Sequence, residues 1–170
     1  MHQVRLKDFL RPEGLYEWED MNDIVWATKE DMSSFENVIS RMRNFALEMT
    51  EAAGINLEFN AVGQAEQFIL SMQQRKNTYM FFKEAVNNAI KHSGASNIIL
   101  DITINAKILD VTIKDNGWGF AYESGAPNSR AAGGSGLDGM KFRAEQINAM
   151  LKIATSPGNC TVLGMQVSVK

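Results

Sequence analysis

Residues 97–114 read NIILDITINAKILDVTIK. Apolar side chains recur at alternate positions in this stretch, namely Ile98, Leu100, Ile102, Ile104, Leu109, Val111 and Ile113. A period of two puts successive side chains on opposite faces of the chain, which is the pattern of a half-buried β-strand. We therefore expect two strands, at 97–105 and 108–114, joined by a short turn at residues 106–107.

Two helices are expected on the N-terminal side of these strands, because apolar residues recur there at intervals of three and four. The first is predicted to begin with a capping box formed by Ser33 and Glu36 and to end at Gly54. A half-buried strand is predicted at 55–59. The second and longer helix is expected to end near residues 92–94.

The C-terminal side begins with a loop at 121–136 that is rich in Gly, Ser, Ala and Asn. Loops of this length within compact domains usually cover a functional site or are disordered. A helix at about 137–150 and strands at 152–155 and 162–169 are expected to follow. This order of elements predicts an α/β (α+β) two-layer sandwich, with a mixed β-sheet, about three helices on one face and a flexible lid.

Composition limits the classes of function. The 170 residues fit one domain, and the net charge of −3 gives no general attraction to nucleic acid or to an anionic membrane. The single cysteine, Cys160, excludes an internal disulfide and a zinc–thiolate cluster. No apolar run approaches the roughly 18 to 20 residues that a membrane span needs. We therefore expect a soluble, cytoplasmic chain that contacts neither nucleic acid nor membrane.

Three segments carry candidate chemistry, and the first reads EAVNNAIKH from Glu84 to His92. Glu84, Asn88 and Lys91 fall on one face of the predicted helix. An acid, an amide oxygen and a cation on one stripe can hold a hydrated Mg²⁺ and a triphosphate, since Mg²⁺ prefers oxygen ligands and commonly takes only one or two from protein. The alternative is a solvated helix end, in which Lys91 and His92 complement the helix dipole.

The second segment, Asp115–Phe120, reads DNGWGF and directly follows a predicted strand. Its glycines let the backbone approach a ligand closely, and its aspartate can accept a hydrogen bond from the exocyclic amino group of adenine. The third segment, Gly133–Leu137, reads GGSGL and opens a predicted helix, where free N–H groups form an anion site. The alternatives are an ordinary turn for the second segment and a flexible linker for the third.

In this order, the three segments resemble the ATP-binding domain of the GHKL superfamily, which includes gyrase, Hsp90, histidine kinases and MutL. Residues 84–92 resemble its N box, with Asn88 at the metal-ligand asparagine. Residues 115–119 resemble the first glycine box, Asp-x-Gly-x-Gly, and residues 134–137 resemble the second, Gly-x-Gly-Leu. Thr161 is similar to a threonine in the last hairpin of the family that helps to hold adenine through water.

Within the superfamily the likeness is greatest to sensor histidine kinases of the nitrate-sensor type, through residues 91–95 and 136–144. The resemblance covers about residues 20–169. It implies an N-terminal lead-in at 1–31, with a remnant of the join to the dimerisation helices, and a GHKL ATP-binding catalytic domain at 32–170.

The resemblance implies binding of ATP together with Mg²⁺, which Asn88 would hold, while the lid closes over the phosphates. Glu84 is the implied catalytic residue and would polarise the incoming histidine. The implied ATP-binding residues are Asn88, Lys91, His92, Asp115, Gly117, Gly119, Phe120, Gly134, Ser135, Gly136, Leu137 and Thr161.

Sensor kinases phosphorylate a histidine in a helical hairpin, and no segment of this sequence resembles that hairpin. His2 stands alone, and His92 belongs to the implied nucleotide site. The phosphoacceptor hairpin is therefore expected on the parent protein or on another chain, with a response regulator as an indirect partner. The isolated chain is expected not to autophosphorylate. Two alternatives stay open: a stand-alone serine kinase of the anti-sigma type, and a non-catalytic nucleotide-binding regulatory module.

Overall fold

The computed structural model describes residues 34–63, 69–105, 107–122 and 134–169, together with Asp23, Val25 and Trp26. The larger elements within these segments are α2 (Phe35–Ala53), β1 (Asn56–Val62), α3 (Met72–His92), β2 (Asn97–Asn105), β3 (Ile108–Asp115), α4 (Gly134–Gln146), β4 (Met150–Ala154) and β5 (Thr161–Ser168). The two strands expected in the opening stretch are β2 and β3, and they are joined by a short connection as predicted.

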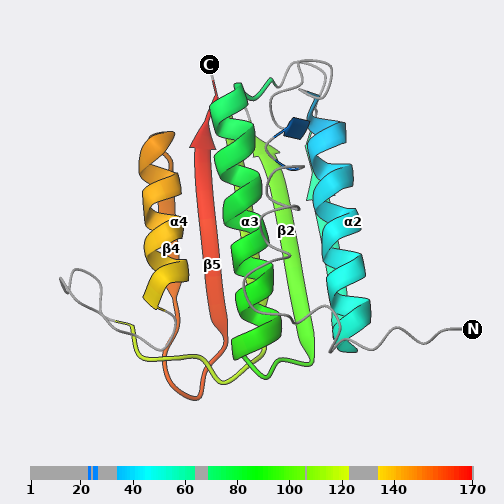
Figure 1. Ribbon diagram of the computed structural model, residues 1–170, viewed down its shortest axis with the longest axis vertical. Coiled ribbons are helices and arrows are strands. Elements are labelled where there is room, and N and C mark those ends of the chain that lie inside the picture. The colour runs from blue at the N-terminus through cyan, green and yellow to red at the C-terminus, as the bar shows by residue number, and fades with distance from the viewer. Residues whose placement is uncertain are drawn as a thin grey trace, which may run out of the picture.

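The sheet has five strands in the order β1-β2-β3-β5-β4. The β1–β2 pair is parallel, whereas the other three pairs are antiparallel. All three long helices lie on the same side of the sheet, with α3 between α2 and α4 (Figure 1). The predicted two-layer sandwich with a mixed sheet and three helices on one face is therefore confirmed.

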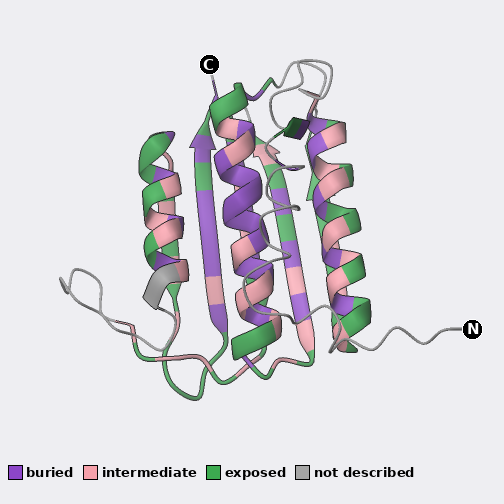
Figure 2. Ribbon diagram, in the orientation of Figure 1, coloured by how far each residue is buried: buried purple, intermediate pink, exposed green. Residues whose placement is uncertain are grey.

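The core lies between the sheet and the helices. The residues that alternate in sequence along β2 and β3 face the helices, and most of them are completely buried, for example Leu100 and Val111. The central helix, α3, is the most deeply buried of the three (Figure 2), because it contacts the sheet as well as both neighbouring helices. Burial of apolar surface on this scale supplies most of the driving force for folding.

The predicted cap of the first helix is wrong by one residue. Ser34 is the N-cap of α2, and its Oγ accepts a hydrogen bond from the backbone N–H of Asn37 at 3.4 Å. The helix starts one residue later than expected, so Asn37 rather than Glu36 occupies the third helical position. The predicted end is correct: Gly54 terminates α2 with φ of 69°, a left-handed conformation that glycine adopts without strain.

The limits of the last helix also differ from the prediction. α4 begins at Gly134, inside the predicted lid, and ends at Gln146 rather than near residue 150. Asn148 takes a positive φ of 51°, and Ala149 donates a hydrogen bond back to the carbonyl of Ala144. This turn reverses the chain into β4 earlier than helical periodicity indicates. Residues 123–133 of the predicted lid lie outside the described residues.

Part of the predicted lead-in joins the core. The ring of Trp26 is 8% exposed and lies 5.2 Å from the ring of Tyr79 on α3, while the Arg41 guanidinium lies 4.7 Å above the Trp26 ring. His2 and the remainder of 1–22 are outside the described residues. Within the described segments, no helix combines the length and the apolar character needed to cross a bilayer.

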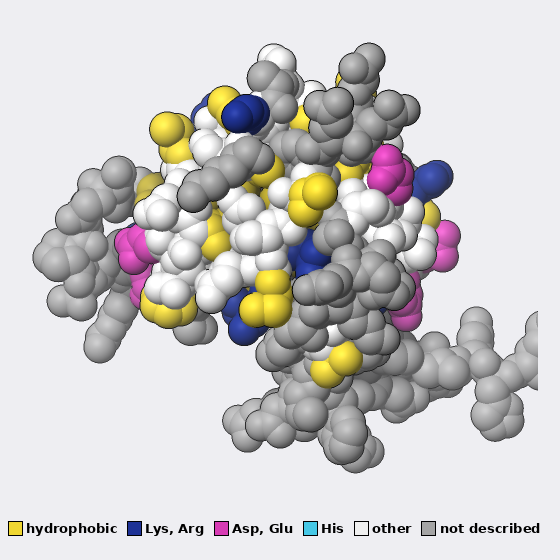
Figure 3. Space-filling view, turned by 90° about the horizontal axis from the view of Figure 1, so that it is seen from above, with side chains coloured by type: hydrophobic (Ala, Val, Ile, Leu, Met, Phe, Trp, Pro, Cys, Tyr) yellow, Lys and Arg dark blue, Asp and Glu magenta, His cyan; other side chains and the backbone are white. Residues whose placement is uncertain are grey.

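The two ends of the sheet differ in what their loops contain. The end where α3 finishes carries all three sequence motifs, and it is the lower end in Figure 1. The opposite end is seen in Figure 3, where the hydrophobic side chains of the described residues stand apart from one another among polar atoms. Scattered apolar side chains are normal on a protein surface and do not indicate an interface.

Candidate functional site

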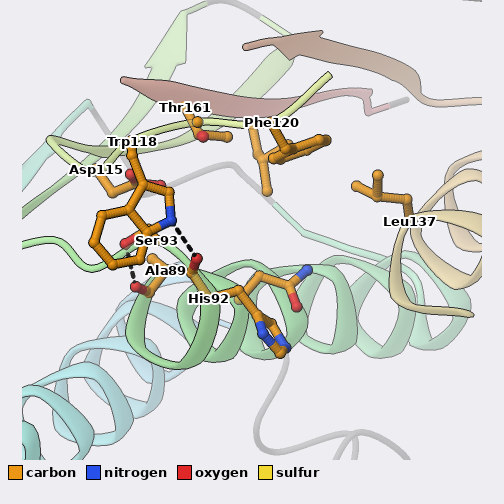
Figure 4. A pocket seen from close by; sticks show the side chains of 11 residues that line it. Ala89, His92, Ser93, Asp115, Trp118, Phe120, Leu137 and Thr161 are labelled. Carbon is orange, nitrogen blue, oxygen red and sulfur yellow. Dashed lines mark hydrogen bonds between the residues drawn. The ribbon is translucent and has the colours of Figure 1, made fainter. Parts of the chain in front are cut away.

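A cavity of about 150 Å³ opens at the end of the sheet that carries the motifs. Its walls come from the last turns of α3, the loop after β3, the start of α4 and the first residues of β5 (Figure 4). The lining residues are Asn88, Ala89, His92, Ser93, Asp115, Trp118, Gly119, Phe120, Leu137, Thr161 and Leu163. Segments separated by more than 70 residues in sequence thus form one site.

Strand register places Asp115 at the centre of this site. It is the last residue of β3, where it pairs with Thr161 of β5 on one side and with Ile98 of β2 on the other. Ile113, two residues earlier on the same face of the sheet, points into the core. The carboxylate of Asp115 therefore enters the space between the sheet and the helices at the point where the apolar core ends. A single acidic group is therefore buried in an otherwise mainly apolar cavity.

The electrostatic state of Asp115 follows from that burial. The residue is 5% exposed, and loss of water raises the pKa of its carboxyl group. Hydrogen bonds from the backbone N–H groups of Gly117, at 2.9 Å, and Thr161, and from the Ser93 hydroxyl, act in the opposite direction and favour the charged form. No ion pair among the described residues includes Asp115. The carboxylate is held in place by neutral donors and keeps acceptor capacity for a ligand.

The glycine-rich loop after β3 is clamped against two other segments. A Cβ at Gly117 would lie 2.2 Å from the carbonyl oxygen of Ser93, and Gly119, with φ of +61°, packs against the carbonyl oxygens of the β4–β5 turn. Beyond the glycines, the backbone N–H of Phe120 donates to Thr155 Oγ1 at 3.2 Å, and that hydroxyl lies 3.1 Å from Thr161 Oγ1. Close backbone approach therefore requires both glycines.

The predicted stripe on α3 divides into two parts. Glu84 and Asn88 are half-buried and point toward the first turn of α4: a Cβ at Gly136 would lie 2.3 Å from Glu84 Oε1 and 3.5 Å from Asn88 Nδ2. Lys91 is exposed and does not line the cavity. The second glycine box thus meets the N box through direct contact with Glu84, an arrangement that the sequence prediction did not include.

The predicted site residues fall into three groups. Those that line the cavity are Asn88, His92, Asp115, Gly119, Phe120, Leu137 and Thr161; those that do not are Glu84, Lys91, Gly117 and Gly136. Gly134 and Ser135 form the first turn of α4, and their side-chain surroundings are not described.

Four lining residues were absent from the prediction. Ala89, Ser93 and Trp118 lie within or beside the predicted motifs, so their positions alone could have suggested them. Leu163 faces the helices as part of the alternation along β5, and only the packing of the strand beside α3 brings it to the cavity.

The donor groups at this site suit a metal that arrives with a phosphate ligand. Among the described residues no three His, Cys, Asp or Glu side chains form a cluster that could enclose a metal ion. Asn88 offers one amide oxygen beside the cavity, and the Glu84 carboxylate lies one helical turn away on α3. Mg²⁺ usually takes one or two protein oxygens and completes its shell with water and phosphate oxygens, so these residues fit it.

Comparisons with known proteins point to one family of domains. The family model described as histidine kinase-like ATPase domain matches residues 45–163. The signal transduction histidine-protein kinase/phosphatase DegS of Brevibacillus brevis is 26% identical over 171 residues, covering 92% of this chain and 42% of DegS. This chain therefore spans less than half the length of that relative.

Solved structures of the same kind share the fold. Histidine kinase AdeS of Acinetobacter baumannii superposes with a TM-score of 0.63 at 15% identity, covering 92% of this chain and 78% of that chain. The catalytic domain of histidine kinase ThkA gives a TM-score of 0.63 at 13% identity and covers 79% of this chain and 92% of that chain.

Proposed function

The chain belongs to the histidine kinase-like ATPase domain family, and from this premise we propose that it binds Mg²⁺-ATP in the cavity between α3 and the loop after β3 and transfers the γ-phosphoryl group to a histidine. The observation that carries the proposal is that Asp115 and Asn88, from separate motifs, line one cavity. We propose residues 32–170 as the catalytic domain, with the acceptor histidine on a dimerisation hairpin of the parent protein or of another chain. A response regulator would then be an indirect partner. The proposed location of the chain is the cytoplasm, where ATP is available.

Base recognition is proposed for the enclosed end of the cavity. The buried carboxylate of Asp115 accepts a hydrogen bond from the exocyclic amino group of adenine, while Phe120, Leu137 and Leu163 provide apolar contact with the ring. Guanine carries a carbonyl at the equivalent position, and a second acceptor facing a buried carboxylate is repulsive. The site therefore selects ATP over GTP.

Phosphate binding is proposed for the side of the cavity between α3 and α4. The N–H groups in the first turn of α4, contributed by Gly134 to Leu137, point to the phosphates and are favoured by the helix dipole. Asn88 would hold Mg²⁺, which supplies charge neutralisation for the phosphates when bound. We retain Lys91 as a cation that acts from the rim, because its long side chain is exposed at the end of α3.

Phosphoryl transfer needs mainly positioning and charge stabilisation. Glu84 contacts the first turn of α4, next to the proposed phosphate region. From there its carboxylate can accept a hydrogen bond from the incoming imidazole and orient the attacking nitrogen. This role requires the acceptor histidine to approach between α3 and α4, beside the proposed phosphate region.

Titration calorimetry with Mg²⁺-ATP tests the nucleotide assignment. We expect binding by the wild-type chain, a loss of about tenfold or more in Asp115→Ala, as for removal of a hydrogen bond to a charged group, and much weaker binding of Mg²⁺-GTP. Glu48→Ala, an exposed change on α2, is the control and should bind ATP normally. Equal ATP affinity in wild-type protein and Asp115→Ala would refute the assignment of the base site.

The transfer step is tested by adding a purified phosphoacceptor hairpin and labelled ATP. Acid-labile, alkali-stable phosphate on the hairpin, lost in Glu84→Ala with ATP binding retained, is the expected result. Acid-stable phosphate on a hydroxyl side chain would instead indicate a serine kinase. ATP binding without transfer to any supplied hairpin would favour the non-catalytic module.

A further inference from the structure

We propose that Trp118 is a positioning residue for the nucleotide: it caps the C-terminal end of α3 from the glycine-rich loop and so sets the distance between the two halves of the cavity. The inference rests on the proposed function, since it concerns how the ATP site is assembled. Trp118 occupies a variable position of the Asp-x-Gly-x-Gly pattern, and no role was assigned to it from the sequence.

Trp118 caps two carbonyl groups at the end of α3. The last carbonyl groups of a helix have no partner within it, and many helices satisfy them by a glycine in the left-handed conformation directly after the last turn. Here Gly94, directly after the C-cap residue Ser93, has that left-handed conformation with φ of 66°, but the carbonyl groups of His92 and Ser93 have their partners outside this turn. The partners come from another segment: Trp118 donates its indole N–H to the His92 carbonyl at 3.2 Å and its backbone N–H to the Ser93 carbonyl at 3.0 Å.

Figure 4 shows the indole of Trp118 turned toward the end of α3, with its N–H directed at the carbonyl of His92. The ring also lies against Gly94, where an added Cβ would come within 2.3 Å of two ring carbons. On its other side the Trp118 carbonyl accepts a hydrogen bond from the backbone N–H of Gly158 at 2.6 Å. One residue therefore joins α3, the glycine-rich loop and the β4–β5 turn.

These contacts matter for the ligand because the residues they fix are cavity residues. Asn88, His92 and Ser93 lie in the last turns of α3, whereas Asp115 and Gly119 flank Trp118 on the opposite wall. If the cap opens, the end of α3 can shift relative to Asp115, and the base and metal contacts no longer form together. Small displacements of positioning groups are costly in sites of this kind.

The exposure of Trp118 separates this role from a general structural one. Its side chain is 64% exposed and is not among the buried core residues. Truncating it removes little buried apolar surface, so the global stability of the fold is expected to change little. A loss of nucleotide affinity would then arise at the cavity, whose lining includes Trp118, rather than from unfolding.

The test compares Trp118→Phe, which removes the indole N–H, with Trp118→Ala, which also removes the ring. We expect Mg²⁺-ATP affinity to fall about three- to tenfold in the first variant, as for one neutral hydrogen bond, and roughly thirtyfold in the second. The melting temperature should stay within about 3 °C of the wild-type value in both. In transfer assays the KM for ATP should rise while kcat changes less than about twofold. Phe142→Ala, which alters a 60% exposed aromatic on α4, is the matched control and should leave affinity unchanged.

A double-mutant cycle adds a geometric readout. Gly94→Ala should weaken ATP binding in the wild-type background for two reasons: its methyl group meets the Trp118 ring, and the left-handed φ of 66° strains an alanine. Only the strain remains in the Trp118→Ala background, so the substitution should weaken binding less there. The proposal is overturned if ATP affinity is unchanged in Trp118→Ala, or if affinity falls only together with a drop of more than about 5 °C in melting temperature in both Trp118 variants. Wild-type protein that binds no ATP would refute the proposed function itself. That result differs from ATP binding whose affinity is unchanged by substitution of Trp118.

Discussion

Asp23 and Asp115 are buried to the same extent, each 5% exposed, yet their carboxylates have opposite surroundings. Asp23 lies between two cations, with its oxygens 2.5 Å from Lys83 Nζ and 2.5 Å from an Arg41 guanidinium nitrogen. Asp115 has only neutral hydrogen-bond donors and faces a cavity. A buried charge that is fully paired holds segments together, whereas one that lacks a cation is costly to keep and is retained where a ligand needs it.

The difference extends to the elements that each aspartate joins. Asp23 precedes α2 in sequence and links the predicted lead-in to α2 through Arg41 and to α3 through Lys83. Trp26 adds a ring contact with Tyr79 beside the same ions. Asp115 has no charged partner of this kind; its neutral donors lie on the loop after β3, at the start of β5 and at the end of α3, around the cavity. We therefore expect the first site to contribute to stability and the second to reduce it.

Removing the Asp23 carboxylate should have the largest effect on stability. Asp23→Ala leaves Lys83 and Arg41 close together without their shared anion, and breaking a buried ion pair in this way costs about 3 to 5 kcal/mol. We expect a somewhat smaller value, about 2 to 4 kcal/mol, because the Arg41 side chain is 29% exposed and partly hydrated. Urea unfolding measures this loss of stability in Asp23→Ala, with Glu48→Ala as the exposed control. A change below about 0.5 kcal/mol would show that the triad does not stabilise the fold.

Replacing Asp115 should act in the opposite direction on stability. Because burial raises its pKa, the native state keeps the proton to a higher pH than the unfolded chain does. The contribution of Asp115 to stability is therefore present below the pKa of the unfolded chain and is lost as pH rises through the native pKa. Asp115→Asn does not titrate, so its free energy of unfolding relative to wild type should increase with pH across the acidic range and then level off. Unfolding curves measured between about pH 3 and pH 7 provide the comparison. A relative stability that falls with rising pH would contradict the pKa direction.

Replacing a third aspartate, Asp138, should have the smallest effect on the free energy of unfolding. Asp138 on α4 lies 4.0 Å from Lys141, and its side chain is 75% exposed. Water and salt screen exposed pairs of this kind, which typically contribute 0 to about 1 kcal/mol. Asp138→Asn should change the free energy of unfolding by less than about 0.5 kcal/mol and leave ATP affinity unchanged. A larger loss would mean that pairing alone, without burial, determines what an aspartate contributes here.

Short-range patterns predicted much of the fold and part of the site. Alternation in β2 and β3, the helical spacing of α2 and the stop at Gly54 are properties of neighbouring residues, and each was read correctly. The start of α2 and the end of α4 were predicted incorrectly, because Ser34 rather than Ser33 is the N-cap and because the turn at Asn148 leads into β4. Helix ends depend on single hydrogen bonds that adjacent polar residues can supply equally well.

The sequence by itself determined which residue types are available at the site: an acid after a strand, an asparagine on a helix and glycines where the backbone packs closely against other segments. Only the tertiary structure decided how they combine. It placed Leu163 and Ser93 in the cavity, left Lys91 outside the cavity lining and brought Glu84 against Gly136. It also distinguished Asp115 from Asp23, since sequence shows that a carboxylate is present but not which charges lie within a few ångströms of it. Those distances depend on the register of β3 with β5 and on the packing of α2 and α3, which no local pattern encodes.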